Sequence, residues 1–129
     1  MEIELSLKKE IIQPSWEAKY SFSPAVIIGC KTIWLAGHVG FVDDSGASLA
    51  GTRQAFKNLE RTLQRAGGTL KDIVSMTVSV SDGRNSQRFT DIRKEIYRKD
   101  FPASTLLTAA ALAAPNIMVE ITGVDVFAA

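Results

Sequence analysis

Hydrophobic and polar residues follow two periodicities along the chain, and together these predict an α+β fold. Residues 73–80 alternate hydrophobic residues (Val74, Met76, Val78) with serine and threonine, which predicts a strand with one buried face. The other strands are predicted from runs of apolar and β-branched residues bounded by turn residues. They are expected at residues 5–12, 25–28, 32–39, 105–112 and 117–127.

Helical spacing appears twice. Thr52 is placed to cap a helix that runs to about Ala66, and the glycine pair after it is a typical helix end. Residues 87–98 repeat the pattern with Phe89, Ile92 and Ile96 on one side. Residues 42–51 contain a run of Asp, Ser and Gly that predicts a loop.

The predicted order is strand-strand-strand-helix-strand-helix-strand-strand, which favours two helices packed on one face of a mixed sheet. Residues 105–111 are apolar or small on both faces of their strand. One interpretation is a central strand whose second face is weakly polar. The other is that a second subunit covers the far face of the sheet.

Composition narrows the class of protein. The 129 residues are 46% hydrophobic and 22% charged, which is typical of one globular domain, here residues 1–129. Lys and Arg number 15 against 14 Asp and Glu, so the net charge is +1. This balance removes the main electrostatic reason to expect nucleic acid or an anionic membrane as a partner.

Candidate chemistry is limited by single copies of the two most reactive residue types. Cys30 and His38 are each the only one of their kind, so a cysteine-based zinc site, a multi-histidine metal site and an intrachain disulfide are excluded. Cys30 has no evident histidine partner and is interpreted as an incidental thiol. The N-terminus lacks a signal-peptide core and no apolar run is long enough to span a bilayer, so we expect a cytoplasmic protein.

Several motifs in the right order resemble those of one family. Residues 33–38 (IWLAGH) resemble a Y-V-S-G-Q strand, and residues 52–59 (TRQAFKNL) resemble T-R-Q-A-L-x-N-L. Residues 66–74 continue that helix-to-strand pattern, while residues 102–103 and 119–121 resemble a C-terminal signature. On these motifs the chain is similar to the Rid (YjgF-like) family of reactive intermediate deaminases over residues 22–126.

The resemblance implies a chorismate-mutase-like fold, a homotrimer and ligand clefts between subunits. It also implies hydrolysis of reactive imine or enamine intermediates to a carbonyl product and ammonia, without a metal or organic cofactor. An arginine would clamp the carboxylate of the small-molecule substrate, and a carboxylate, here Glu120, would position or deprotonate the attacking water.

The chain departs from the family pattern at several site positions. The family's P-A-R-S reads P-A-S-T here, so Ser104 stands where the clamping arginine is expected and Thr105 follows it. Phe22 replaces a tyrosine, and His38 replaces a glutamine next to the retained Gly37. We expect Ser104, Thr105, Gly37, His38 and Phe22 to line the substrate site, with the altered positions changing substrate choice.

Arg93 is the candidate replacement for the missing arginine. At 100° per residue it lies about 40° from Phe89, inside the apolar arc of its helix. Either its stem packs on the core while its head reaches water, or its guanidinium enters the cleft and takes over the clamp.

Two further side chains have alternative roles. Glu120, expected to share a strand face with Met118 and Thr122, is either an ion-paired structural carboxylate or a general base. His38, expected to share a face with Trp34 and Ala36, is either a hydrogen-bonded structural residue or a ligand contact.

Two functions remain open. The first is an imine/enamine hydrolase with altered substrate choice. The second is a non-catalytic, regulatory member of the family that binds a small molecule. Action on RNA is disfavoured by the charge balance and by the lack of a basic-aromatic stripe.

Overall fold

The structure is a computed structural model that describes residues 8–29, 31–41 and 48–127, with the backbone alone for residues 48–50. Its strands are β1 (Lys9–Ile11), β2 (Ala25–Ile28), β3 (Thr32–Phe41), β4 (Ile73–Val80), β5 (Ala103–Thr108) and β6 (Ile117–Val126). Its α-helices are α1 (Ser48–Ala66) and α2 (Ser86–Tyr97), and short 3₁₀ turns are η1 (Trp16–Tyr20), η2 (Leu70–Asp72) and η3 (Gly83–Asn85). The predicted order of strands and α-helices is confirmed.

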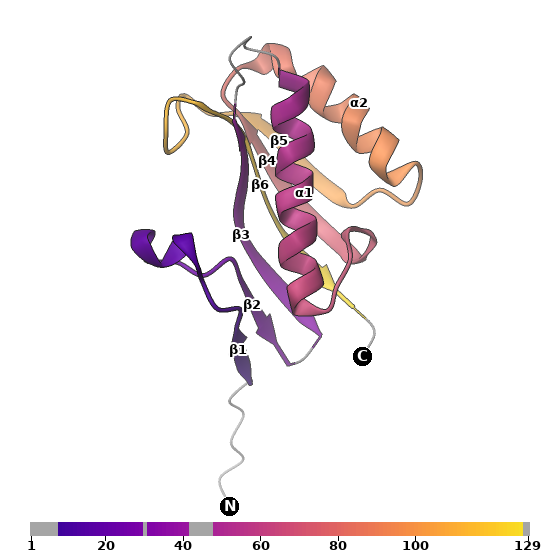
Figure 1. The fold of residues 1–129 in the computed structure, drawn as a ribbon. Coiled ribbons are helices and arrows are strands. Elements are labelled where there is room, and N and C mark those ends of the chain that lie inside the picture. The colour runs from indigo at the N-terminus through magenta and orange to yellow at the C-terminus, as the bar shows by residue number, and fades with distance from the viewer. Residues whose placement is uncertain (1–7, 30, 42–47, 128–129) are drawn as a thin grey trace, which may run out of the picture.

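Within the described residues, the strands form one six-stranded sheet in the order β1-β2-β3-β6-β4-β5. Neighbouring strands are antiparallel except β4 and β5, which are parallel because α2 provides the crossover between them. Both helices lie on the same face of the sheet (Figure 1). This confirms the mixed sheet covered on one side, and we call the uncovered side the open face.

The core lies between the sheet and the helices. Phe56 of α1 and Phe89 of α2 stack with ring centroids 5.5 Å apart. Burying a side chain of this kind contributes about 1.5–3 kcal/mol. The sheet side of the core comprises Ile33, Leu35, Ile73, Met76, Val78, Val80, Val119 and Ile121, all nearly inaccessible.

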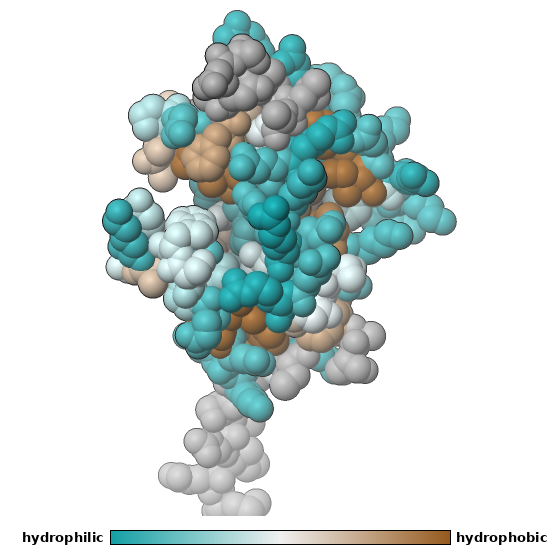
Figure 2. Space-filling view, viewed as in Figure 1, coloured by the Kyte–Doolittle hydropathy of each residue, from teal (hydrophilic) through white to brown (hydrophobic). Residues whose placement is uncertain are grey.

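The outward surface of the helix layer is largely hydrophilic (Figure 2). Its exposed positions on α1 include Arg53, Lys57 and Arg61, opposite the buried Leu59 and Leu63. Neither helix is long and apolar enough to cross a membrane, among the residues that the structure describes.

The first helix begins earlier than predicted. It starts at Ser48, so residues 48–51 are helical rather than part of a loop, and the rest of that predicted loop (residues 42–47) lies outside the described residues. Thr52 is buried inside the helix. The helix approaches the strand closely where two glycines meet, because a Cβ on Gly40 would lie 1.7 Å from the backbone oxygen of Gly51.

β-Bulges place some side chains on the opposite face of the sheet from the one that strict alternation predicts. A bulge between Leu35 and His38 buries His38 on the helix side, while Trp34 stays 53% exposed on the open face, so the predicted shared face is wrong. A second bulge, between Ile73 and Ser75, buries Ile73 and leaves Val74 half exposed instead of in the core.

Two predicted strands are shorter than expected, and one of them, β5, also lies at a different place in the sheet. Within the described residues the first strand spans only Lys9–Ile11, and β5 ends at Thr108 rather than at residue 112. Among the described strands, β5 lies at the edge of the sheet and pairs only with β4, so its interpretation as a central strand is wrong.

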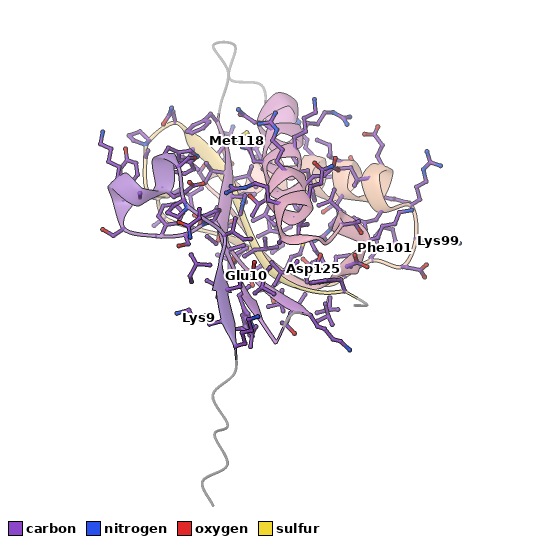
Figure 3. The ribbon with its side chains drawn as sticks, turned by 60° about the horizontal axis from the view of Figure 1, so that its bottom comes forward. Lys9, Glu10, Lys99, Phe101, Met118 and Asp125 are labelled. Carbon is purple, nitrogen blue, oxygen red and sulfur yellow. The ribbon has the colours of Figure 1, made fainter. Side chains whose placement is uncertain are left out.

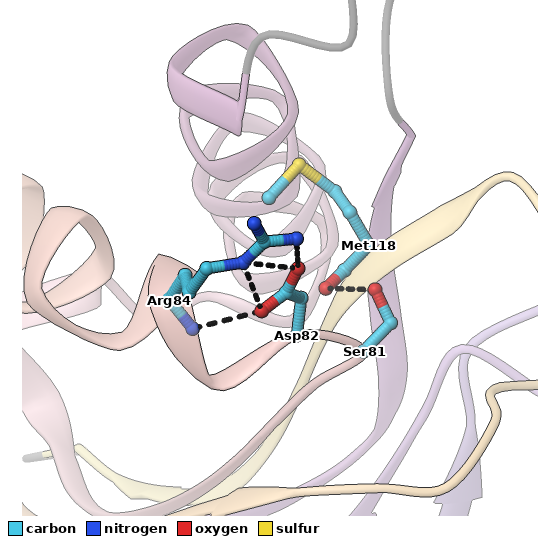
Figure 4. A network of polar contacts seen from close by, with 4 residues as sticks. All are labelled: Ser81, Asp82, Arg84 and Met118. Atoms are coloured by element: carbon cyan, nitrogen blue, oxygen red, sulfur yellow. Dashed lines mark hydrogen bonds and ion pairs between the residues drawn. The ribbon is translucent and has the colours of Figure 1, made fainter.

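The turn after β4 is fixed by local polar contacts (Figure 4). The Asp82 carboxylate accepts from the backbone N–H of Arg84 at 2.9 Å and from its guanidinium Nη2 at 2.6 Å. These bonds hold the pKa of Asp82 at about 2. Ser81 donates from its hydroxyl to the Met118 carbonyl, which ties the turn to the start of β6.

Candidate functional site

Glu120 lies on β6 with its carboxylate directly over Gly37 of β3. Its neighbours along the strand, Val119 and Ile121, are buried beneath the helices, so Glu120 points to the open face. A Cβ at Gly37 would lie only 1.8 Å from Oε1 of Glu120. Glycine at position 37 therefore provides the space that the carboxylate occupies.

Hydroxyl groups surround Glu120 on the open face. Ser79 of β4 is its direct cross-strand partner. One step along the sheet, Thr77 pairs with Thr122 on one side and with Thr105 on the other, which makes a row of three threonines. Among the described residues Glu120 has no ion pair or hydrogen bond, so its carboxylate is free to accept from a ligand or from water.

One expected neighbour of Glu120 lies elsewhere. Met118 is 1% exposed, and its sulfur packs against Gly51 of α1. A register irregularity between Gly40 and Phe41, where β6 begins, accounts for this change of face. The expectation that Met118 shares the face of Glu120 is therefore wrong.

Arg93 of α2 reaches the strand position where the family motif has its arginine. Its Nη1 donates to Oγ of Ser104 at 2.5 Å. The guanidinium carbon lies 5.1 Å above the Phe89 ring, and Nη1 is 3.6 Å from the Met76 sulfur. These contacts place a half-buried guanidinium at the start of β5.

The Arg93 guanidinium has donors to spare. Burial lowers the pKa of Arg93 from its usual value, with an opposing contribution from Tyr97, but an arginine stays charged. No carboxylate within the described residues forms a salt bridge with it. A guanidinium offers five N–H donors in a planar fork, so a carboxylate ligand could be bound bidentately here.

The candidate residues divide between the two faces of the sheet. Ser104 pairs with the buried Met76 and so faces the helix side with Arg93, while Thr105 pairs with Thr77 and faces the open side with Glu120. β5 and β6 are also separated by β4. One subunit therefore does not bring Arg93 and Glu120 together.

His38 is engaged inside the subunit on the helix side. Its Nδ1 lies 2.8 Å from the Ala36 carbonyl oxygen, and its Nε2 lies 2.7 Å from the Thr62 hydroxyl of α1. Because a carbonyl only accepts, Nδ1 donates, and in the neutral ring Nε2 accepts from Thr62. Burial lowers the pKa of His38, which keeps the ring neutral. The ring does not join Glu120 on the open face.

Phe22 belongs to an aromatic cluster that the hydrophobic pattern did not predict. It is partly buried and packs edge-to-face against Trp16 at 5.6 Å, and Trp16 meets Tyr20 in the same manner at 6.2 Å. Trp16 and Tyr20 are 59% and 64% exposed. The sequence signal for such a surface is the presence of two aromatic residues, Trp16 and Tyr20, among the five residues of η1. Two further site residues, Ser79 and Thr77, were not predicted, and strand alternation was the only signal for their hydroxyls. Thr122 was expected on the face of Glu120, and the strand register places it there.

Other features lie away from these residues. A hollow of about 320 Å³ is lined by Glu60, Thr69, Leu70, Lys71, Ile96 and Tyr97 on the helix side. No group of three or more His, Cys, Asp or Glu side chains in the described part of the chain could hold a metal ion. Cys30 lies outside the described residues.

The chain is similar to known proteins over most of its length. The family model described as Endoribonuclease L-PSP matches residues 12–127. A human protein named 2-iminobutanoate/2-iminopropanoate deaminase is 30% identical over 96 residues, which cover 70% of this chain and 69% of that one.

Solved structures share the fold. A Mycobacterium tuberculosis member of the YjgF/YER057c/UK114 family has a TM-score of 0.82 at 28% identity, covering 93% of this chain and 100% of that one. A Yersinia pestis member of the Rid protein family, described as of unknown function, has a TM-score of 0.79 at 26% identity with the same coverage. With its sequence matched across residues 12–127 and its sheet and helices matched by these structures, the chain belongs to the YjgF/Rid family.

Proposed function

We propose that this chain is an imine deaminase, which hydrolyses reactive imine or enamine intermediates to a carbonyl product and ammonia. The observation that carries the proposal is the contact between Nη1 of Arg93 and Oγ of Ser104, which delivers a guanidinium to the strand position of the family's missing arginine. The human relative named as a deaminase of 2-iminobutanoate and 2-iminopropanoate supports the reaction class.

The site is formed between subunits of a homotrimer with the chorismate-mutase-like fold. Arg93 and Ser104 come from one subunit, and Glu120 comes from the open face of the next. The division of these residues between two faces of one sheet supports this arrangement, because neither half is a complete site. Exposed apolar side chains on the open face, Trp34, Leu107 and Val126, give a neighbour a surface to cover.

The chemistry requires few groups. Arg93 binds the substrate carboxylate, and Glu120 accepts a proton from water as the water oxygen bonds to the imine carbon. Glu120 passes this proton to the imine nitrogen, which gives a neutral carbinolamine. Glu120 then moves the hydroxyl proton of the carbinolamine to the same nitrogen as the C–N bond breaks, and a carbonyl compound and ammonia leave. The imine carbon is already electrophilic, so orientation supplies much of the rate and no metal or organic cofactor is required.

The remaining predicted residues act around this pair. Thr105 and Thr77 contribute hydroxyls on the face of Glu120, whereas the Thr122 hydroxyl donates to the Leu35 carbonyl at 2.8 Å. Gly37 keeps the space for its carboxylate, and Phe22 contributes an apolar wall. His38 is a positioning residue in this scheme, because it bonds the Ala36 carbonyl next to Gly37.

The test follows the decay of imino acids generated in situ by an amino-acid oxidase. We expect the wild type to accelerate the decay, Glu120→Gln to lose about a hundredfold or more of that rate, and Arg93→Ala to raise KM strongly. Ser104→Ala removes one hydrogen bond to Arg93 and should have a smaller effect.

Matched controls separate the site from general damage. Glu10→Gln removes an exposed carboxylate on β1, and Arg61→Ala removes an exposed arginine of α1 outside the site. Both should keep wild-type rates. Wild-type protein that leaves imine decay at its spontaneous rate would refute the proposal.

The alternative is a family member that binds a small carboxylate without turnover. It is favoured by one feature, since one donor of Arg93 is already used by Ser104 and the clamp has fewer groups left for a substrate. It predicts Arg93-dependent binding of pyruvate or 2-oxobutanoate by calorimetry with no gain in imine hydrolysis. With a net charge of +1, we do not propose RNA as the substrate.

A further inference from the structure

Asp125 is a buried carboxyl that the proposed reaction does not use. It lies near the end of β6, far along the strand from Met118 (Figure 3). Its exposed fraction is 0%, and neither carboxyl oxygen has a hydrogen-bond partner within the described residues. A buried carboxylate without donors is strongly disfavoured, so this position requires an explanation.

Three elements enclose the Asp125 carboxyl. Its cross-strand neighbours, Ile33 of β3 and Ile73 of β4, are apolar. The connection from α1 to β4 lies against it, because a Cβ at Gly68 would be 2.9 Å from Oδ1 of Asp125. The titratable groups that face it are Asp72 of that connection and Tyr97 of α2, and neither supplies positive charge.

This environment favours the neutral acid. Burial, reinforced by the negative charge of Asp72, raises the pKa of Asp125 from 3.8 to about 7. Tyr97 responds in the same sense: its pKa is raised by its own burial and further by Asp125. Geometry and electrostatics agree that the closed packing around Asp125 holds a proton.

We propose that Asp125 is a proton-controlled latch, whose neutral form keeps residues 67–72 and the last turn of α2 closed on the sheet and whose ionised form loosens them. The two packed segments are joined to each other, because the Tyr97 hydroxyl donates to the Leu70 carbonyl at 2.8 Å. Opening either one admits water to the carboxylate, which then titrates near its ordinary value.

The latch is connected to the candidate site through α2. Arg93 lies one turn before Tyr97 on the same helix, so loosening the last turn changes the support of the guanidinium. The inference does not depend on deaminase activity, because the latch is defined by packing and can be measured on the protein without substrate.

The direct test is a titration of the full-length wild type with ¹³C-labelled aspartate, followed by NMR. The Asp125 carboxyl resonance, assigned by its loss in Asp125→Asn, should titrate near pH 7. Asp72→Asn should shift that midpoint to lower pH because it removes the neighbouring negative charge. A carboxyl that titrates below about pH 5 overturns the proposal.

Hydrogen exchange then measures the opening. After correction for the intrinsic rate, exchange of residues 67–72 and 94–97 should increase about tenfold per pH unit between about pH 4 and pH 7 and then level off. Asp125→Asn should abolish this dependence, and Asp82→Asn, in the turn after β4, should retain it. Equal pH profiles for wild type and Asp125→Asn would overturn the latch, whether or not the protein hydrolyses imines.

Discussion

A guanidinium can be delivered to one point of a sheet from the strand itself or from the helix above it. Here the helix supplies it, since Arg93 ends at the Ser104 hydroxyl. The helical arc placed Arg93 among apolar residues, and the structure shows why: its guanidinium covers the Phe89 ring. The two sequence-based interpretations of Arg93 therefore share one geometry, in which the stem packs and the head keeps free donors.

Gly37 offers a test of Glu120 that leaves the carboxylate in the chain. A methyl group at position 37 would occupy the place of Oε1 of Glu120, so Gly37→Ala forces that side chain to another rotamer. The displaced atoms are the end of a flexible side chain. We expect the free energy of unfolding to change by less than about 1 kcal/mol while the rate of imine hydrolysis falls about a hundredfold.

Gly40→Ala is the matched control for that substitution on the same strand. Its Cβ would meet the backbone oxygen of Gly51, which cannot rotate away. We expect Gly40→Ala to cost about 2–3 kcal/mol of stability, measured by denaturant unfolding. Equal stability losses in both variants, or an unchanged rate in Gly37→Ala, would contradict the role given to this contact.

At the scale of elements, His38 joins β3 to α1 through Thr62. The folded state holds the ring neutral with a lowered pKa, whereas the unfolded chain takes up a proton near pH 6.5. The unfolded state therefore binds more protons below that pH, and the stability supplied by His38 is lost as the pH falls.

His38→Gln should remove this loss on the acid side. We expect the stability of the wild type relative to His38→Gln to be greatest above pH 6.5 and to decline towards pH 5, measured by denaturant unfolding at each pH. Asp125 contributes with the opposite sign over the same range, but it is present in both proteins and cancels in the difference. A difference that is constant with pH would contradict a neutral, buried His38.

The secondary-structure elements show which structural features the sequence pattern can predict and which it cannot. Periodicity predicted the order of strands and helices, because alternation and helical spacing report which side chains are buried. It failed at the bulges, since one extra residue exchanges the faces of everything beyond it, as with His38 and Val74. Periodicity could not predict the contact of Arg93 with Ser104 either, because this contact depends on where α2 lies over β5.

At the scale of the whole molecule, the two edges of the sheet differ in how strongly their residues discourage pairing with another chain. The β1 edge carries Lys8, Lys9 and Glu10, and such charges discourage pairing with another chain. The β5 edge, at residues 103–108, has no charged residue, and Leu107 there is 41% exposed. This asymmetry favours an assembly that covers β5 and the open face, which is where the two halves of the proposed site must meet.

Mixing two impaired variants tests that arrangement directly. In a site shared between neighbours, Arg93 comes from one subunit and Glu120 from the next. Subunits carrying Arg93→Ala still provide Glu120, and subunits carrying Glu120→Gln still provide Arg93.

Random co-assembly of equal amounts therefore rebuilds a complete site at about one interface in four. At substrate concentrations below KM, we expect co-expressed variants to recover about a quarter of the wild-type rate of imine hydrolysis, while each variant alone stays far below that rate. Activity no higher than that of the parents would mean that both residues act within one subunit or that they do not share a site. The separation of Arg93 and Glu120 by the sheet argues for recovery.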